Sequence, residues 1–236
     1  MLNNQKENKE FLGKEEMGIT AASDEGIMPY VDANDKNELK IRKIPQRLAA
    51  KMAGVNVGST YEPIINNQTD AAAYQKALNE ITGNHSISFK TEYCQNQGDS
   101  GQCASYSIAI AKSIIEGKLI PQSEIGDNPD FATHGATRIW KTAANDGLTE
   151  SEILLAIDAQ LTMGRPAIVQ CRKDSNYSSK KNAHWAVVVS KSGSQYTIID
   201  PITTKEGSWT CSLSKMQWYN SSIGLTGYAI FSTELY

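Results

Sequence analysis

The hydrophobic pattern of this chain changes from a helical period to a strand period at Gly164-Arg165-Pro166. Before that point, apolar residues recur at spacings of three and four, which is typical of amphipathic helices. After it, short runs of apolar and β-branched residues alternate with turn sequences, which is typical of strands. Because helices come first and several short strands follow, the sequence predicts an α+β domain with an antiparallel sheet.

The periodicity also predicts where the individual elements lie. Helices are predicted over residues 45–52, 70–81, 104–116, 137–145 and 151–163. Strands are predicted over residues 167–171, 185–189, 196–199, 208–212 and 228–232. The helix over 104–116 carries only Lys112 and Glu116 as charged residues, so most of its circumference should be buried. We therefore expect it to be the central helix of the domain.

The N-terminal quarter of the chain differs from the rest in composition. Residues 1–60 are polar and poorly patterned, so we expect a flexible extension with at most short helices, acting as a pro-segment or leader. Residues 61–236 then form the folded domain. No run approaches 18 apolar residues, so no membrane span is expected. The net charge of −3 argues against a nucleic-acid binder or a polybasic membrane binder.

The four cysteines differ in their surroundings. None belongs to a Cys-x-x-Cys pair, so the sequence indicates no metal site, and nothing in it suggests an organic cofactor. Cys171 and Cys211 lie in predicted strands, and Cys94 has no helix behind it. Cys103 stands at the start of the central helix, whose dipole favours a thiolate. Gln97, shortly before it, offers an amide that can donate to an oxyanion.

A thiol nucleophile needs a base, and the base needs an orienting acceptor. The chain has three histidines, His85, His134 and His184, and only His184 begins an apolar strand. Asp200 ends the following strand. The two side chains share one face of the hairpin only if its turn has an odd number of residues or a bulge compensates for an even one.

These residues suggest a division of roles. Cys103 would attack as a thiolate, His184 would carry the proton, and Asp200 would orient the imidazole. Gln97 and the backbone N–H of Cys103 would form an oxyanion hole. Each residue taken alone has an ordinary structural explanation, since buried cysteines, strand histidines and Asp-Pro turns are common. The combination, in this order along the chain, favours a cysteine enzyme.

The same segments resemble the papain-like cysteine peptidases over roughly residues 90–236: QGDSGQCASY at 97–106, HWAVV at 184–188 and IDP at 199–201. The first segment resembles the staphopains. The others, with LTMGRPAI at 161–168, resemble the bacteriocin leader-processing peptidases. The resemblance implies a papain-like fold, with a helical lobe carrying the catalytic helix, an antiparallel sheet lobe and a cleft between them. It also implies Cys103 as nucleophile, His184 as base, Asp200 as orienting residue and Gln97 in the oxyanion hole.

The chain also departs from these families. Papain and the staphopains have Asn where this chain has Asp200, whereas the leader-processing branch has Asp. That branch usually has Gly where this chain has Ala104. The resemblance to bacterial enzymes suggests a protein exported from a bacterium, although residues 1–26 contain no apolar secretory core.

Three functions fit the sequence. The first is a cysteine peptidase acting on a protein or peptide, with the N-terminal extension interacting with the cleft. The second is an effector toxin that uses the same thiol for deamidation or transglutamination of side-chain amides. The third is a non-catalytic binding module on the same fold. A binding module has no need of Gln97, Cys103, His184 and Asp200 together, so the third function is disfavoured.

Overall fold

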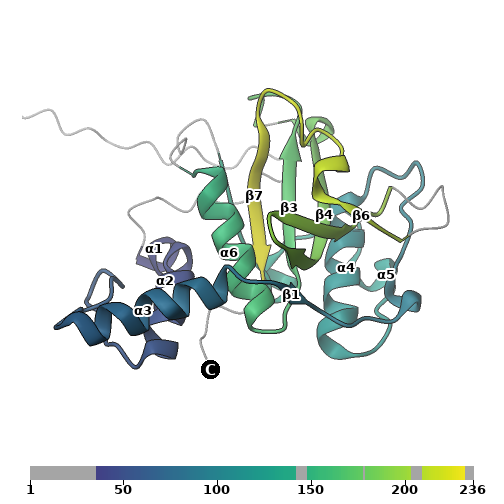
Figure 1. The fold of residues 1–236 in the computed structure, drawn as a ribbon. Coiled ribbons are helices and arrows are strands. Elements are labelled where there is room, and N and C mark those ends of the chain that lie inside the picture. The colour runs from purple at the N-terminus through teal and green to yellow at the C-terminus, as the bar shows by residue number, and fades with distance from the viewer. Residues whose placement is uncertain (1–35, 142–147, 178, 203–208, 232–236) are drawn as a thin grey trace, which may run out of the picture. The chain divides into compact units, whose positions relative to one another are not determined.

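The structure of the chain is a computed structural model that describes residues 36–141, 148–177, 179–202 and 209–231. These residues all lie within one compact unit, Val31–Tyr236. Helices cover an antiparallel sheet, so the predicted α+β class is confirmed. Figure 1 shows the sheet with α4 on one side and α6 on the other.

The sheet contains seven strands, and every pair of neighbours is antiparallel. Six strands form a continuous path: β2 (Thr137–Trp140), β7 (Gly224–Ile230), β3 (Ala167–Arg172), β4 (Ala183–Ser192), β5 (Gln195–Ile199) and β6 (Thr210–Ser212). The short strand β1 (His85–Ser86) pairs with the far end of β4. All five strands predicted from the sequence are present. Strands β3 and β7 are buried along their whole length, which explains their nearly continuous apolar sequences.

Two helices pack on opposite faces of the central strands. Helix α4 (Cys103–Glu116) shares a buried cluster with Ile168 and Val187, while α6 (Glu150–Thr162) shares another with Val169 and Val188. Neighbouring residues of a strand point to opposite faces, so each central strand contributes to both cores. Both helices match their predicted ranges to within about one residue, and burial of α4 confirms its central place.

The N-terminal helices belong to the same core. Helices α1 (Lys36–Arg42), α2 (Ile44–Ala53) and α3 (Gln68–Ile81) precede the sheet. Ile44 and Leu48 of α2 are buried in one cluster with Ile81 of α3 and residues of α6. The short helix predicted over 45–52 is therefore real, but it is part of the folded unit. The boundary expected near residue 60 lies earlier in the structure, because these apolar side chains complete the core.

The helix predicted over 137–145 is wrong where the structure describes it, and residues 142–147 lie outside the described residues. Thr137–Trp140 instead form β2, which pairs with β7. Gly227 of β7 lies opposite Trp140, and a Cβ on Gly227 would approach Trp140 Cβ to 2.6 Å. Pairing with the exposed edge of β7 gives this segment backbone hydrogen bonds that outweigh its local helical preference.

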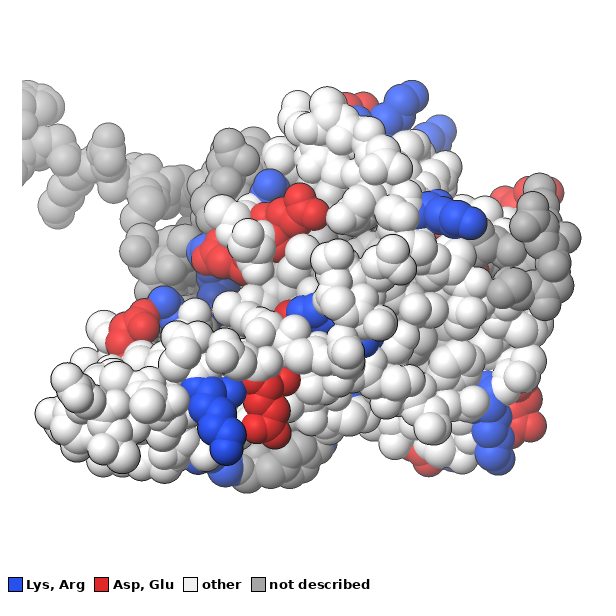
Figure 2. Space-filling view, in the orientation of Figure 1, with Lys and Arg blue, Asp and Glu red and all other residues white. Residues whose placement is uncertain are grey.

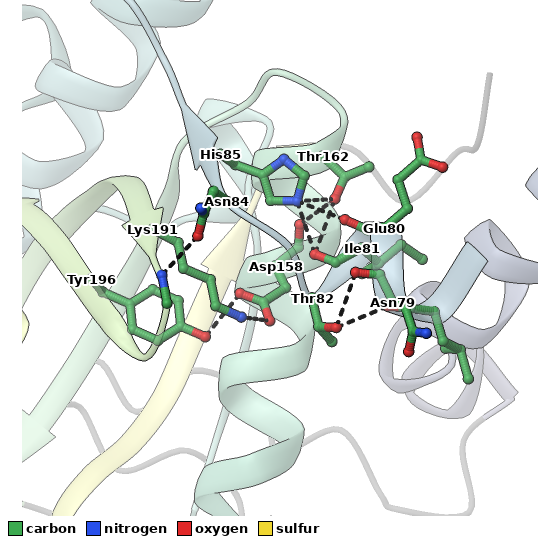
Figure 3. Close-up of polar contacts among 12 residues, drawn as sticks. Asn79, Glu80, Ile81, Thr82, Asn84, His85, Asp158, Thr162, Lys191 and Tyr196 are labelled. Carbon is green, nitrogen blue, oxygen red and sulfur yellow. Dashed lines mark hydrogen bonds and ion pairs between the residues drawn. The ribbon is translucent and has the colours of Figure 1, made fainter. Parts of the chain in front are cut away.

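A polar cluster joins α6 to the sheet on the side away from α4 (Figure 3). Lys191 Nζ donates to Asp158 Oδ2 at 2.5 Å, and the Tyr196 hydroxyl donates to Asp158 Oδ1 at 2.8 Å. Burial raises the pKa of Asp158, although its bonds to Lys191 and Tyr196 act in the opposite direction. His85 Nε2 lies 3.1 Å from Thr162 Oγ1, which ties β1 to the end of α6.

The remaining described elements are short. They are η1 (Thr91–Tyr93), α5 (Gln122–Ile125), η2 (Ala132–His134), η3 (Lys180–Asn182) and η5 (Leu213–Lys215). Figure 2 shows Lys and Arg interspersed with Asp and Glu in small groups on one face of the molecule. Across the described ranges, no helix is both long enough and apolar enough to span a bilayer.

Candidate functional site

Cys103 lies where the start of α4 meets the start of β4. It is the first residue of the helix and only 9% exposed. Its Sγ lies 4.0 Å from the carbonyl oxygen of Ala183, the first residue of β4. Backbone N–H groups in the first turn of a helix lack intrahelical acceptors and carry the positive end of the dipole. The thiol therefore stands beside groups that favour negative charge.

His184 and Asp200 form a buried pair next to this thiol. His184 Nε2 lies 2.8 Å from Asp200 Oδ1, and each residue is 1% exposed. Asp200 Oδ1 also accepts a hydrogen bond from the backbone N–H of Ile202 at 2.9 Å. Because Nε2 is engaged by Asp200, Nδ1 is the ring nitrogen that remains for the thiol.

The register of the β4–β5 hairpin explains why these two side chains meet. Ser192 pairs with Gln195, so the turn consists of Gly193 and Ser194, an even number of residues. The register then shifts between Val188 and Ser190, where Val189 is the extra residue of a β-bulge. The bulge restores the parity that a two-residue turn alone would have broken. The sequence allowed His184 and Asp200 to share one face of the hairpin through an odd turn or through a bulge. The structure has the bulge.

Asp200 and Cys103 both affect the pKa of the His184 imidazole. Burial lowers the pKa of His184, but the hydrogen bonds and charges of Asp200 and Cys103 outweigh it and raise the pKa to about 9. The imidazole therefore carries its proton at neutral pH. An imidazolium beside a thiol favours the thiolate.

Two of the other cysteines have pKa values that burial raises. Burial raises the pKa of Cys94 to about 11, and burial also raises the pKa of Cys171. Both thiols are therefore held in the neutral, poorly nucleophilic form at physiological pH. Cys211 lies in β6, as the strand prediction placed it. Within the described residues, none of the four cysteines forms a disulfide.

Gln97 lies in the loop before α4, and a backbone bond holds it near the buried pair. Its N–H donates to the carbonyl oxygen of Pro201, the residue after Asp200, at 3.0 Å. The residue is 8% exposed, and its buried Oε1 has no hydrogen-bond partner among the described residues. A buried amide oxygen without a hydrogen-bond partner costs free energy in a folded protein. This cost suggests that the Gln97 side chain is needed at this position.

The remaining histidines occupy other places. His85 Nε2 lies 2.9 Å from the carbonyl oxygen of Ile81, and His134 lies in η2. Among the residues that the structure describes, no group of three metal-ligating side chains gathers. The sequence interpretation allowed for a bulge without placing it at Val189, and it missed Arg138, a half-buried arginine that lies against Trp185, the residue after His184. The aromatic neighbours of Arg138 come from separate parts of the chain, and Trp140 is the only one near it in the sequence.

Comparison with protein-family models gives no match for this chain, and comparison with curated proteins gives none either.

Proposed function

We propose that this chain is a cysteine peptidase of papain-like fold that hydrolyses peptide bonds in a protein or peptide substrate. The observation that carries the proposal is the buried 2.8 Å contact between His184 and Asp200, with the imidazole electrostatically coupled to the thiol of Cys103. Thiol-dependent acyl transfer needs a nucleophile, a base and an acceptor that orients the base. Cys103, His184 and Asp200 would fill these roles.

In the first half of the proposed reaction, the Cys103 thiolate attacks the carbonyl carbon of the scissile bond. The resulting oxyanion receives hydrogen bonds from the backbone N–H of Cys103 and from the Gln97 side-chain amide. The His184 imidazolium then gives its proton to the leaving amine as the carbon–nitrogen bond breaks. The product of this half is a thioester on Cys103 and a free amine.

In the second half, neutral His184 removes a proton from water, which attacks the thioester carbonyl. The carbon–sulfur bond breaks, the acid product leaves, and the proton returns the pair to its starting state. Asp200 holds the Nε2–H tautomer of the ring and stabilises the imidazolium. Its second bond, from the Ile202 N–H, keeps the carboxylate oriented.

Thiol reactivity tests this proposal directly. We expect iodoacetamide at pH 5.5 to modify Cys103 at least about ten times faster than free cysteine, because the neighbouring His184 imidazolium would favour the nucleophilic thiolate form of the thiol. Intact-mass spectrometry gives the rate, and peptide mapping gives the site. Cys94→Ala is the matched control and should leave the rate unchanged. A rate equal to that of free cysteine would contradict the proposal.

A further inference from the structure

Arg138 of β2 lies in a cage of three aromatic rings, one of which belongs to Trp185, the residue after His184. Its guanidinium carbon lies 3.6 Å from the ring centre of Trp140, 5.1 Å from that of Phe131 and 5.8 Å from that of Trp185. Phe131 and Trp185 also contact each other, with ring centres 4.9 Å apart. Three aromatic rings surround the guanidinium, which restricts its movement before any ligand arrives.

The charge of Arg138 is only partly compensated. Its Nε atom is buried and has no hydrogen-bond partner among the described residues. Burial lowers its pKa to about 10, although the Asp130 carboxylate attracts the charge and acts in the opposite direction. Arg138 therefore stays protonated at neutral pH. A half-buried guanidinium with a buried, unpaired Nε costs free energy, and a bound anion would offset that cost.

The sheet register connects this cage to His184. Trp140, Gly227, Gln170 and Trp185 are paired residues that form one row across four strands. Trp185 directly follows His184 and shares a buried cluster with Cys103. Gly227 has no side chain, and Trp140 occupies the space that a Cβ on Gly227 would take. Arg138 lies two residues before Trp140 in β2, so its side chain is on the same sheet face as this row.

We propose that Arg138 binds the carboxylate of a Glu or Asp side chain in the substrate and so selects acidic residues close to the scissile bond. This inference rests on the proposed peptidase function. A planar guanidinium can donate two parallel N–H bonds to a carboxylate, which neither a neutral amide nor an ammonium reproduces. A purely structural arginine, stacked on Trp140 to cover it, would show no dependence on substrate charge.

Matched peptides test the inference. Peptides that differ only by Glu or Gln at one position are compared with the parent protein and with Arg138→Gln. We expect the parent to cleave the Glu peptide with a kcat/KM about 10-fold higher or more at one position, and Arg138→Gln to lose that preference. Equal cleavage of the two peptides by the parent at every position would overturn the inference.

A binding measurement separates failure of the inference from failure of the proposed function. Cys103→Ala protein, which cannot form a thioester, is titrated with the same two peptides by calorimetry. Binding of the Glu peptide at least about 10-fold more tightly supports the carboxylate site even if the parent cleaves neither peptide. Equal affinities overturn it even if the parent is an active peptidase. This experiment does not need an Arg138 variant, so an effect of that residue on folding cannot obscure the answer.

Discussion

Replacing Asp200 with Asn tests the electrostatics of the proposed triad most sharply. The substitution keeps the shape of the side chain and removes the charge that faces His184 at 2.8 Å. Burial lowers the pKa of His184, and Asp200 is the leading group that opposes it. Without the carboxylate, we therefore expect the pKa of His184 to fall below its ordinary value.

The size of the effect follows from the pKa. A change from the ordinary value of 6.5 to about 9 corresponds to roughly 3 kcal/mol in favour of the protonated ring. This stabilisation is fully present below pH 6.5 and is lost as the pH rises through about 9, because the folded state holds the proton more tightly than the unfolded chain. Removing most of it should lower the rate of Cys103 alkylation at neutral pH by about 100-fold.

Two measurements check this prediction. NMR titration of the imidazole protons should place His184 near pH 9 in the parent and below pH 6.5 in Asp200→Asn. Iodoacetamide kinetics should show the corresponding fall in rate. Asp99→Asn, which changes an exposed carboxylate in the loop before Cys103, is the matched control and should behave like the parent. A titration of His184 that stays near pH 9 in Asp200→Asn would refute the reasoning.

Three further predictions concern the oxyanion hole and the core. Gln97→Ala should lower kcat by about 100- to 1000-fold with little change in KM, and a loss under about fivefold would remove Gln97 from the hole. Lys191→Met leaves the buried Asp158 carboxylate without its cation, so urea denaturation should show a loss of about 3–5 kcal/mol. The double variant Asp158→Leu/Lys191→Met should recover much of it, and equal losses in both variants would contradict this account. Gly227→Ala forces a Cβ to within 2.6 Å of Trp140 Cβ, so thermal unfolding should show a loss of about 1–3 kcal/mol, and an unchanged midpoint would contradict that.

The elements predicted correctly are those whose periodicity is strong. Helix α4 shows an apolar pattern around most of its circumference, and β3 to β5 are runs of β-branched residues between turns. Strand β2 was misassigned because its four residues have no strand period of their own. They are a strand because β7 offers an open edge and Gly227 makes room for Trp140. Tertiary pairing of this kind leaves no local trace in the sequence.

The candidate site also combines features that the sequence predicts with features that depend on tertiary pairing. Cys103, His184 and Asp200 were identified from residue type and order, and the structure brings the last two into contact. The bulge that makes this contact possible was foreseen only as one of two routes. Val189 belongs to a strand that pairs on both sides, and its carbonyl oxygen accepts from the Ile87 N–H at 2.9 Å. Where the extra residue falls depends on these partners, which local sequence does not reveal.

Peptide cleavage by the parent protein and by Cys103→Ala tests the central claim most directly. A library of unstructured peptides is incubated with each protein, and new termini are identified by mass spectrometry. The triad predicts cleavage by the parent at defined bonds and none by Cys103→Ala, with the Cys94→Ala control cleaving like the parent. Absence of cleavage by the parent, or the same cleavage by Cys103→Ala, would contradict the claim that this chain is a cysteine peptidase acting through Cys103.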